Sequence, residues 1–138
     1  MANRPEQTYY VNFDSAVAVY VQIENQVQFA VASGKLKPGE ALPTIHNMAA
    51  MLGLNANTIV KAYRDLEVLG VVQTRRGAGV LIADKAPAAC RDRIRAAMRA
   101  HLKEAVAECI ACGVAEAEIR KIVGKTVQTA PNPYEAKA

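Results

Sequence analysis

The fold is decided by the stretch from residue 33 to residue 82, which reads SGKLKPGEALPTIHNMAAMLGLNANTIVKAYRDLEVLGVVQTRRGAGVLI. Apolar residues recur at helical spacing in two short segments of this stretch, which predicts two amphipathic helices that meet near residues 53–55. The two helices can bury their apolar stripes against each other, and this leaves one face of the second helix in solvent. The stripes are Ile45, Met48, Ala49 and Leu52 in the first helix, and Ile59, Ala62, Tyr63 and Leu66 in the second.

Both predicted helices carry recognisable signals at their ends. Thr44 follows Pro43 just before the first helix, and Asn55 stands where the second helix needs an N-cap residue. Gly53 ends the first helix, and Gly70 stands at the C′ position of the second, where a left-handed backbone is common. The sequence therefore predicts two helices joined by a tight turn.

A β-hairpin is predicted directly after the second helix. Residues 71–74 and 80–82 are β-prone, and the glycines between them tolerate a positive φ at the tip. Arg75 and Arg76 stand side by side at this tip. Two ordered arginines are costly for stability alone, so a phosphate backbone or a minor groove is their natural partner.

The solvent face of the second helix carries hydrogen-bonding and basic side chains. Asn57, Lys61 and Arg64 lie opposite the apolar stripe, with Thr58 beside them, and their lengths suit contacts with base edges or phosphates. Two helices followed by a hairpin are typical of a winged helix-turn-helix, which places its second helix in the major groove of DNA. Taken alone, a basic helix face is more often just solvated.

Several phrases of the chain, in the right order, resemble the DNA-binding domain of the GntR family of bacterial transcription regulators. The resemblance covers residues 16–83 closely, and the short tail after them looks like that of the YtrA subfamily, whose members carry only a small helical dimerisation unit. The residues that carry it are Tyr20-Val21-Gln22-Ile23, Ser33-Gly34-Lys35-Leu36-Lys37-Pro38-Gly39, Leu42-Pro43-Thr44, Asn55-Ala56-Asn57-Thr58, Ala62-Tyr63, Leu66-Glu67 and Thr74-Arg75-Arg76-Gly77-Ala78-Gly79.

The resemblance implies particular contacts with DNA. It implies contacts at Thr44, Asn57, Thr58, Lys61, Arg75, Arg76 and Gly77. The helix pattern adds Asn55 and Arg64, and we also expect His46 at the interface. Many members of the family carry an arginine where this chain has His46, and another where it has Val60. Loss of two charged donors should weaken phosphate binding or change base preference. His46 is interpreted as a surface residue near phosphate rather than a metal ligand.

Charge and composition set further bounds. Residues 1–84 hold seven basic and seven acidic side chains, and residues 85–138 hold ten and six, which accounts for the net charge of +4. The charge balance does not itself argue for DNA binding; the placement of the basic residues does. No apolar run is long enough to cross a membrane, and residues 1–13 lack the core of a signal peptide, so we expect a cytoplasmic protein without membrane contact.

Regions on either side of the central stretch complete the organisation. A further amphipathic helix with the stripe Tyr20, Ile23, Val27, Ala30 and Val31 is expected to begin at a cap formed by Ser15 or Asp14 and to end at Gly34. A short strand at residues 41–42 could join the hairpin as a third strand. We expect a DNA-binding domain over 14–84, a helical unit over 85–128, and flexible tails over 1–13 and 129–138.

The tail after residue 85 has a helical pattern of its own. Two helices separated near Gly113 offer more apolar surface than one protomer can cover, and pairing with a second copy would bury it. The plainer alternative is that the tail folds back onto its own DNA-binding domain. The residues predicted at the dimer interface are Ile94, Met98, Leu102, Val106, Ile110, Ile119, Ile122 and Val123.

Three cysteines invite a redox or metal interpretation. Cys109 and Cys112 form a CxxC pair, and Cys90 lies far off along the same predicted helix. A helix C-terminus disfavours thiolates, and no second pair supplies the ligands that zinc needs. We therefore expect small buried thiols in a helix interface and neither a metal site nor a cofactor.

These features predict an α+β, mainly α protein, with a winged helix-turn-helix followed by a two-helix dimerisation unit. We expect a homodimeric, sequence-specific DNA-binding regulator, most simply a repressor, that acts on a near-palindromic operator. A second hypothesis is a sensor regulator whose C-terminal helices respond to a small molecule or a metal. An enzyme is not expected, because the chain offers no catalytic triad, no paired carboxylates and no phosphate loop.

Overall fold

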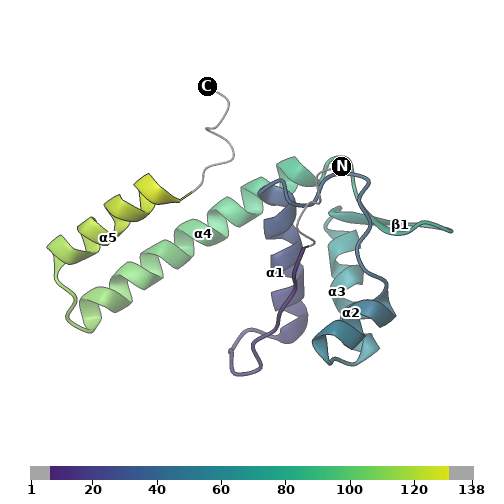
Figure 1. The fold of residues 1–138 in the computed structure, drawn as a ribbon, viewed down its shortest axis with the longest axis horizontal. Coiled ribbons are helices and arrows are strands. Elements are labelled where there is room, and N and C mark those ends of the chain that lie inside the picture. The colour runs from purple at the N-terminus through teal and green to yellow at the C-terminus, as the bar shows by residue number, and fades with distance from the viewer. Residues whose placement is uncertain (1–6, 131–138) are drawn as a thin grey trace. The chain divides into compact units, whose positions relative to one another are not determined.

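The computed structural model describes residues 7–130, and Figure 1 draws their helices and strands as a ribbon. The helices are α1 (Val19–Ala32), α2 (Ile45–Leu52), α3 (Ala56–Val68), α4 (Ala86–Ala111) and α5 (Glu116–Thr129). The strands β1 (Val72–Arg75) and β2 (Gly79–Ile82) form one antiparallel hairpin. These residues form two compact units, of which the first ends at Ile94 and the second begins at Arg95, within α4.

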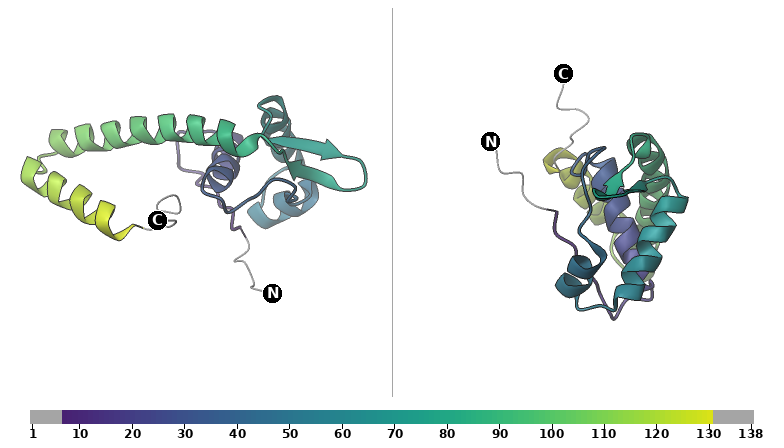
Figure 2. Two further views of the ribbon diagram at one scale, coloured as in Figure 1. Left: turned by 90° about the horizontal axis from the view of Figure 1, so that it is seen from above. Right: turned by 90° about the vertical axis from the view of Figure 1, so that its right-hand side faces the viewer.

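The first unit is built on three helices and the hairpin that follows them. α3 packs against both α1 and α2, and β1 follows closely after α3. Figure 2 shows the hairpin projecting away from the three helices. The fold class predicted from the sequence, mainly helical with a small two-stranded wing, is confirmed.

A continuous apolar core holds this unit together. It takes residues from every element up to the first turns of α4, and burial of each large aliphatic side chain contributes about 1.5–3 kcal/mol. Both predicted stripes supply it, so the interpretation of α2 and α3 as mutually packed helices is confirmed. The largest fully buried side chains are Ile23, Val27, Met48, Ile59, Leu66, Val71, Ile82 and Cys90.

The turn between α2 and α3 follows the predicted signals. Gly53 caps α2 in a left-handed conformation, with φ of 66°, and Leu54 N donates to Ala49 O over 2.9 Å. Gly70 follows α3 with φ of 77°. Both positions favour glycine because a Cβ atom strains a backbone with positive φ.

The strand expected at residues 41–42 is reduced to a single bridge. Ala41 pairs with Leu81 of β2, and Leu42 N donates to Val80 O over 2.8 Å. Ile82 N in turn donates to Glu40 O over 2.9 Å. The loop before α2 is thereby fixed to the base of the wing.

The predicted start of α1 is wrong. The helix begins at Val19 with Ala18 at the N-cap, whose side chain has no oxygen to offer. Ser15 is used earlier, because its hydroxyl accepts a hydrogen bond from Val17 N over 3.1 Å. Serine side chains form such local turns readily, and here the turn competes with the cap.

Part of the expected N-terminal tail is fixed to α1. Gln26 holds Tyr10 through a pair of backbone bonds, with Tyr10 N donating to Oε1 over 3.0 Å and Nε2 donating to Tyr10 O over 2.6 Å. Gln22 holds Asn12 in the same way, over 2.8 and 2.9 Å. Two amide side chains one helical turn apart thus hold the backbone of this segment. Residues 1–6 and 131–138 of the predicted tails lie outside the described residues.

The second unit consists of the rest of α4 and of α5. The chain reverses after α4 at Gly113, where φ is 92°, and Val114 N donates to Cys109 O over 2.9 Å. Within the described residues α5 buries none of its side chains. Large apolar side chains are therefore exposed along both helices, namely Met98, Leu102, Ile110, Ile122, Val123 and Val127.

Candidate nucleic-acid interface

α2 and α3 each begin at a residue whose side chain caps the helix. Thr44 Oγ1 accepts a hydrogen bond from Asn47 N over 3.1 Å, and Asn55 Oδ1 accepts one from Asn57 N over 2.8 Å. Each cap satisfies a backbone N–H that the helix leaves free. The Thr44 hydroxyl hydrogen remains available to a phosphate oxygen, since the side chain acts only as an acceptor in the cap.

α3 is held firmly enough to present its outer face. Ile59, Ala62 and Leu66 are fully buried beneath it. Tyr63 O–H donates to Pro43 O over 2.7 Å, and burial raises the pKa of this phenol far above its usual value. This bond joins the middle of α3 to the residue that precedes Thr44, so the two capped helix starts are fixed relative to each other.

The outer face of α3 carries the side chains predicted to contact DNA. Asn57, Lys61 and Arg64 are exposed, and Thr58 is half-buried beside them. Asn57 uses only its backbone N–H in the helix cap, so its side-chain amide keeps both donors and its acceptor. This face offers one bidentate amide and two cations along less than three turns of helix.

Lys61 is oriented by neighbours on both sides. Its Nζ lies 3.0 Å from Asp65 Oδ1 and 5.3 Å from the centre of the Tyr20 ring. The hydrogen bond to Asp65 raises the pKa of Lys61, and the cation also benefits from the aromatic face. Lys61 nevertheless keeps about half of its side chain in solvent, with 53% exposed.

The wing places its two arginines at the end of the hairpin. Arg75 is the last residue of β1 and pairs with Gly79, and Arg76 follows in the turn. Ala78 N donates to Arg75 O over 3.0 Å, and Gly77 has φ of 83°. Arg75, Arg76 and Gly77 are all exposed, as a contact with DNA requires.

His46 is exposed on the first turn of α2, close in sequence to the cap at Thr44. All ten residues predicted at the interface belong to the first unit. The residues predicted at the dimer interface lie in the second unit, apart from Ile94. That side chain is buried in the core of the first unit with 9% exposed.

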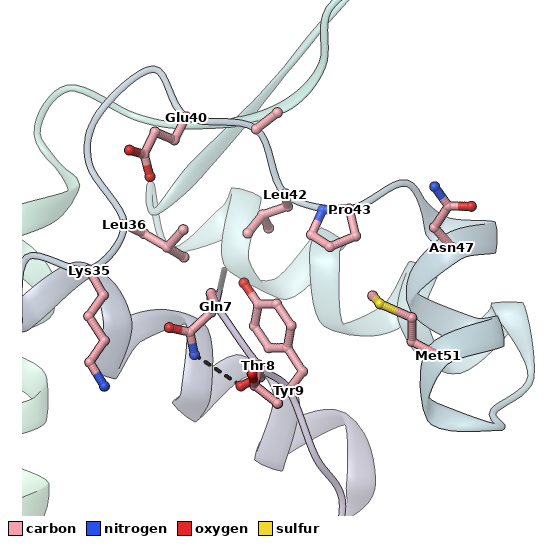
Figure 3. Close-up of a pocket in the computed structure, with 11 residues that line it drawn as sticks. Gln7, Thr8, Tyr9, Lys35, Leu36, Glu40, Leu42, Pro43, Asn47 and Met51 are labelled. Carbon is pink, nitrogen blue, oxygen red and sulfur yellow. Dashed lines mark hydrogen bonds between the residues drawn. The ribbon is translucent and has the colours of Figure 1, made fainter. Parts of the chain in front are cut away.

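The sequence did not reveal a hollow that lies beside α2. It has a volume of about 870 Å³, and Figure 3 shows Tyr9 and Met51 on its walls. Burial raises the pKa of Tyr9 to about 12. Its hydroxyl makes no hydrogen bond with any residue in the described range. The only available signal was the spacing of Gln22 and Gln26, which brings residues 7–12 to this place.

The cysteines differ in their surroundings. Cys90 is buried, Cys109 is half-buried, and Cys112 is exposed with its thiol directed to Cys109 O over 3.4 Å. Cys109 and Cys112 lie at the end of α4 in a single protomer, so their expected burial in a helix interface stays a prediction. Within residues 7–130, histidine, cysteine and acidic side chains form no group of three that could hold a metal ion.

No helix in the described part of the chain is both long enough and apolar enough to cross a bilayer.

Two helices joined by a tight turn, a solvent-facing polar helix face and an arginine-tipped hairpin define a winged helix-turn-helix protein. Residues 19–82 match the family model for bacterial regulatory proteins of the gntR family. The repressor YtrA of Bacillus subtilis is 31% identical over 100 residues, which cover 72% of this chain and 77% of that protein. The chain belongs to the GntR family and is a DNA-binding transcriptional regulator of the helix-turn-helix type.

Two further relatives support the assignment. The regulator YhcF of B. subtilis is 42% identical over 74 residues, which cover 54% of this chain and 61% of that protein. The solved structure of YtrA from Sulfolobus acidocaldarius has a TM-score of 0.53 at 30% identity, and the match covers 67% of this chain and 95% of that one. The predicted resemblance to the YtrA-like members of the family is thereby confirmed.

Proposed function

We propose that this chain is a transcriptional repressor that binds a near-palindromic operator as a homodimer. The observation that carries the proposal is the geometry of α3. One face of this helix is buried and bonded to the loop before α2, and the other is exposed and carries Asn57, Lys61 and Arg64. A helix held in this way is suited to lie in a major groove.

Different side chains have different parts in the proposed complex. Asn57 and Thr58 read base edges, because an amide can bond an adenine edge in a bidentate manner. Lys61, Arg64, Arg75 and Arg76 contact phosphates or the minor groove. The remaining residues lie at the two helix starts and at the wing tip, where they come close to the DNA backbone. They are Thr44, His46, Asn55 and Gly77. In a bacterium the protein would bind its operator in the cytoplasm, where the DNA is located.

The second unit supplies the dimer contact in this proposal. α4 and α5 form between them a groove of about 700 Å³, whose walls are mostly apolar. Exposed apolar residues continue along it, and Leu102 and Ile110 have 55% and 63% of their surface in solvent. A second copy that lays its own α4 and α5 against this groove would bury both surfaces in one symmetric contact. The groove is lined by Leu102, Val106, Ile110, Val114, Glu116, Ile119, Arg120, Val123 and Gly124.

The experiment that tests the proposal uses the DNA immediately upstream of the chain's own gene. We expect a footprint with two protected regions whose centres lie about one helical turn, 34–36 Å, apart. Sedimentation of the free protein should give twice the mass of the chain at the concentration that produces the footprint. A monomer that protects a single region would contradict the dimer, and the absence of any protection would show that this stretch of DNA contains no operator.

The same groove favours one alternative, a regulator that senses a small apolar molecule through its C-terminal helices. Its volume is within the range of small-molecule sites, and the Glu116–Arg120 ion pair at its edge, with N and O 2.9 Å apart, could orient a polar group. A thermal-shift screen of metabolites and metals distinguishes the two hypotheses. A ligand that raises the melting temperature and also changes DNA affinity would favour the sensor.

A further inference from the structure

Glu24 is an unusual residue for the interface between α1 and α3. It is only 9% exposed, and its Oε1 atom accepts no hydrogen bond from any residue that the structure describes. Glu24 shares a hydrogen bond with the carboxyl group of Asp65 on α3 and also interacts electrostatically with Lys61. Burial, followed by the hydrogen bond and repulsion from Asp65, raises the pKa of Glu24 to about 7.

Asp65 links this buried carboxyl group to the exposed face of α3. Hydrogen bonds from Glu24 and then from Lys61 lower the pKa of Asp65, so its carboxylate is the acceptor for both. Asp65 Oδ1 lies 3.0 Å from Lys61 Nζ, and Lys61 also lies over the ring of Tyr20. A continuous path therefore leads from a buried acid to a cation on the face that we assign to DNA.

The protonation state of Glu24 decides what Lys61 is free to do. When Glu24 carries a proton, it donates to Asp65, and that carboxylate keeps a partner if Lys61 turns to a phosphate. When Glu24 is ionised, two adjacent carboxylates need the Lys61 cation between them, and their charge opposes an approaching phosphate. Loss of the proton should therefore hold Lys61 on the protein and weaken its contact with DNA.

We propose that Glu24 is a positioning residue that acts on Lys61 through Asp65, so that duplex DNA binds the Glu24-protonated protein and takes up a proton above neutral pH. This inference rests on the proposed function, because it needs Lys61 to contact DNA. It adds a buried residue of α1, which lies behind the recognition face and not on it, to the determinants of DNA affinity.

Other charged groups lie near Glu24 on the elements packed against α1. α3 contributes Asp65 and Lys61, while Arg64 acts on Asp65. α4 contributes Arg93, whose Nε donates to Gln28 Oε1 over 2.9 Å, one turn beyond Glu24. The segment held by Gln22 and Gln26 carries Tyr9, whose pKa is raised by burial to about 12, so that it is uncharged at neutral pH. Asp65 and Lys61 are thus the groups through which Glu24 acts.

The test measures affinity for a mixed-sequence DNA duplex at constant salt between about pH 6 and pH 8.5. Uptake of one proton changes DNA affinity by at most tenfold per pH unit, and only above the pKa of Glu24. The affinity of the full-length wild type for the duplex should therefore fall about tenfold between the lower and the upper pH. The Glu24→Gln variant keeps a neutral donor of the same shape. We expect it to bind at the upper pH as the wild type binds at the lower one.

Three variants make the comparison specific. Glu67→Gln removes an exposed carboxylate from the same helix α3 and should keep the wild-type pH slope. Lys61→Met should abolish the difference that Glu24→Gln makes, because it removes the group that Glu24 controls. Histidine changes charge in the same pH range, so the Glu24→Gln comparison is repeated in a His46→Gln background. The Glu24-dependent slope should persist there.

Two outcomes are separable. Equal pH slopes for the wild type and Glu24→Gln, in protein that binds the duplex, would overturn this inference and leave the proposed function standing. No binding of the duplex at any pH would overturn the proposed function and this inference with it. A carboxyl-carbon NMR titration supplies an independent measure, since the Glu24 midpoint should rise when DNA is added, and an unchanged midpoint would contradict proton uptake.

Discussion

The two compact units obtain their stability in different ways. The first unit encloses a core to which α1, α2, α3, the wing and the start of α4 all contribute, and it bonds its loops to that core through Tyr63, Gln22 and Gln26. In the second unit α5 buries none of its side chains, and the largest apolar residues stay exposed. A unit that buries its own apolar side chains can be predicted from the apolar pattern of its sequence. A pair of helices with exposed apolar side chains is instead typical of a surface that a partner covers.

The largest effect is expected from charges placed on the exposed apolar surface of the second unit. Met98→Asp with Leu102→Asp would put carboxylates into the proposed dimer contact, where burial without a partner is costly. The dimer should dissociate, and operator affinity should fall by about 10³-fold or more toward the non-specific level. Sedimentation and titration on one and on two half-sites measure both quantities.

A matched variant controls for added charge on the same helix. Ala96→Asp with Ala100→Asp has the same spacing on exposed positions of α4 that lie outside the predicted dimer interface. It should remain dimeric and bind the operator normally. If the Met98 and Leu102 variant also stays dimeric and binds the full site, the assignment of the second unit to dimerisation is wrong.

Asn57→Ala tests whether the exposed face of α3 reads bases. The first unit should stay folded, because the backbone N–H of residue 57 keeps its bond to Asn55 and the side chain lies outside the core. We expect a loss of about 1–3 kcal/mol for the operator and little loss for random DNA, measured by titration of both. Asn25→Ala, an exposed asparagine on α1, should change neither affinity. Equal losses on both DNAs would assign Asn57 to helix placement.

Most of the first unit could be predicted from the sequence because its signals are local. Apolar spacing defined α2 and α3, and Gly53 and Gly70 marked their ends. The start of α1 could not be predicted in this way. Ser15 has the chemistry of a cap, but it forms a turn with Val17 that residue type alone does not reveal.

Long-range contacts were the part of the site that the sequence did not supply. The bond from Tyr63 to Pro43 joins residues twenty apart, and the Glu24–Asp65 contact joins two helices. From the sequence alone, Glu24 beside the apolar stripe of α1 would be predicted to lie in solvent. The structure shows that it is buried where α1 packs against α3. The candidate DNA face could be predicted because most of its residues lie on one helix and one hairpin. Glu24 could not be predicted as part of the site, because it lies on a different helix.

The wing tests a smaller, sequence-independent contribution of the first unit. Arg75→Ala with Arg76→Ala should weaken binding to all DNA sequences about tenfold and reduce the slope of log affinity against log salt by about one to two. Binding at several salt concentrations measures this slope. Lys121→Ala with Lys125→Ala removes the same charge from exposed positions of α5 and should leave the slope unchanged. An unaltered slope in the arginine variant would remove the wing from the interface.

The smallest expected effect probes the self-sufficiency of the first unit. Tyr63→Phe removes the hydroxyl that donates to Pro43 O and leaves a half-enclosed carbonyl without that donor. The free energy of unfolding should fall by about 1 kcal/mol, because a single hydrogen bond of this kind contributes about 0.5–1.5 kcal/mol. Denaturant titration should give this loss at every protein concentration, since the bond lies within one unit. The stability of the wild-type dimer should rise with protein concentration. The Met98 and Leu102 variant should lose this dependence, because it no longer forms the dimer. A concentration-dependent effect of Tyr63→Phe would mean that the first unit, too, draws stability from the partner.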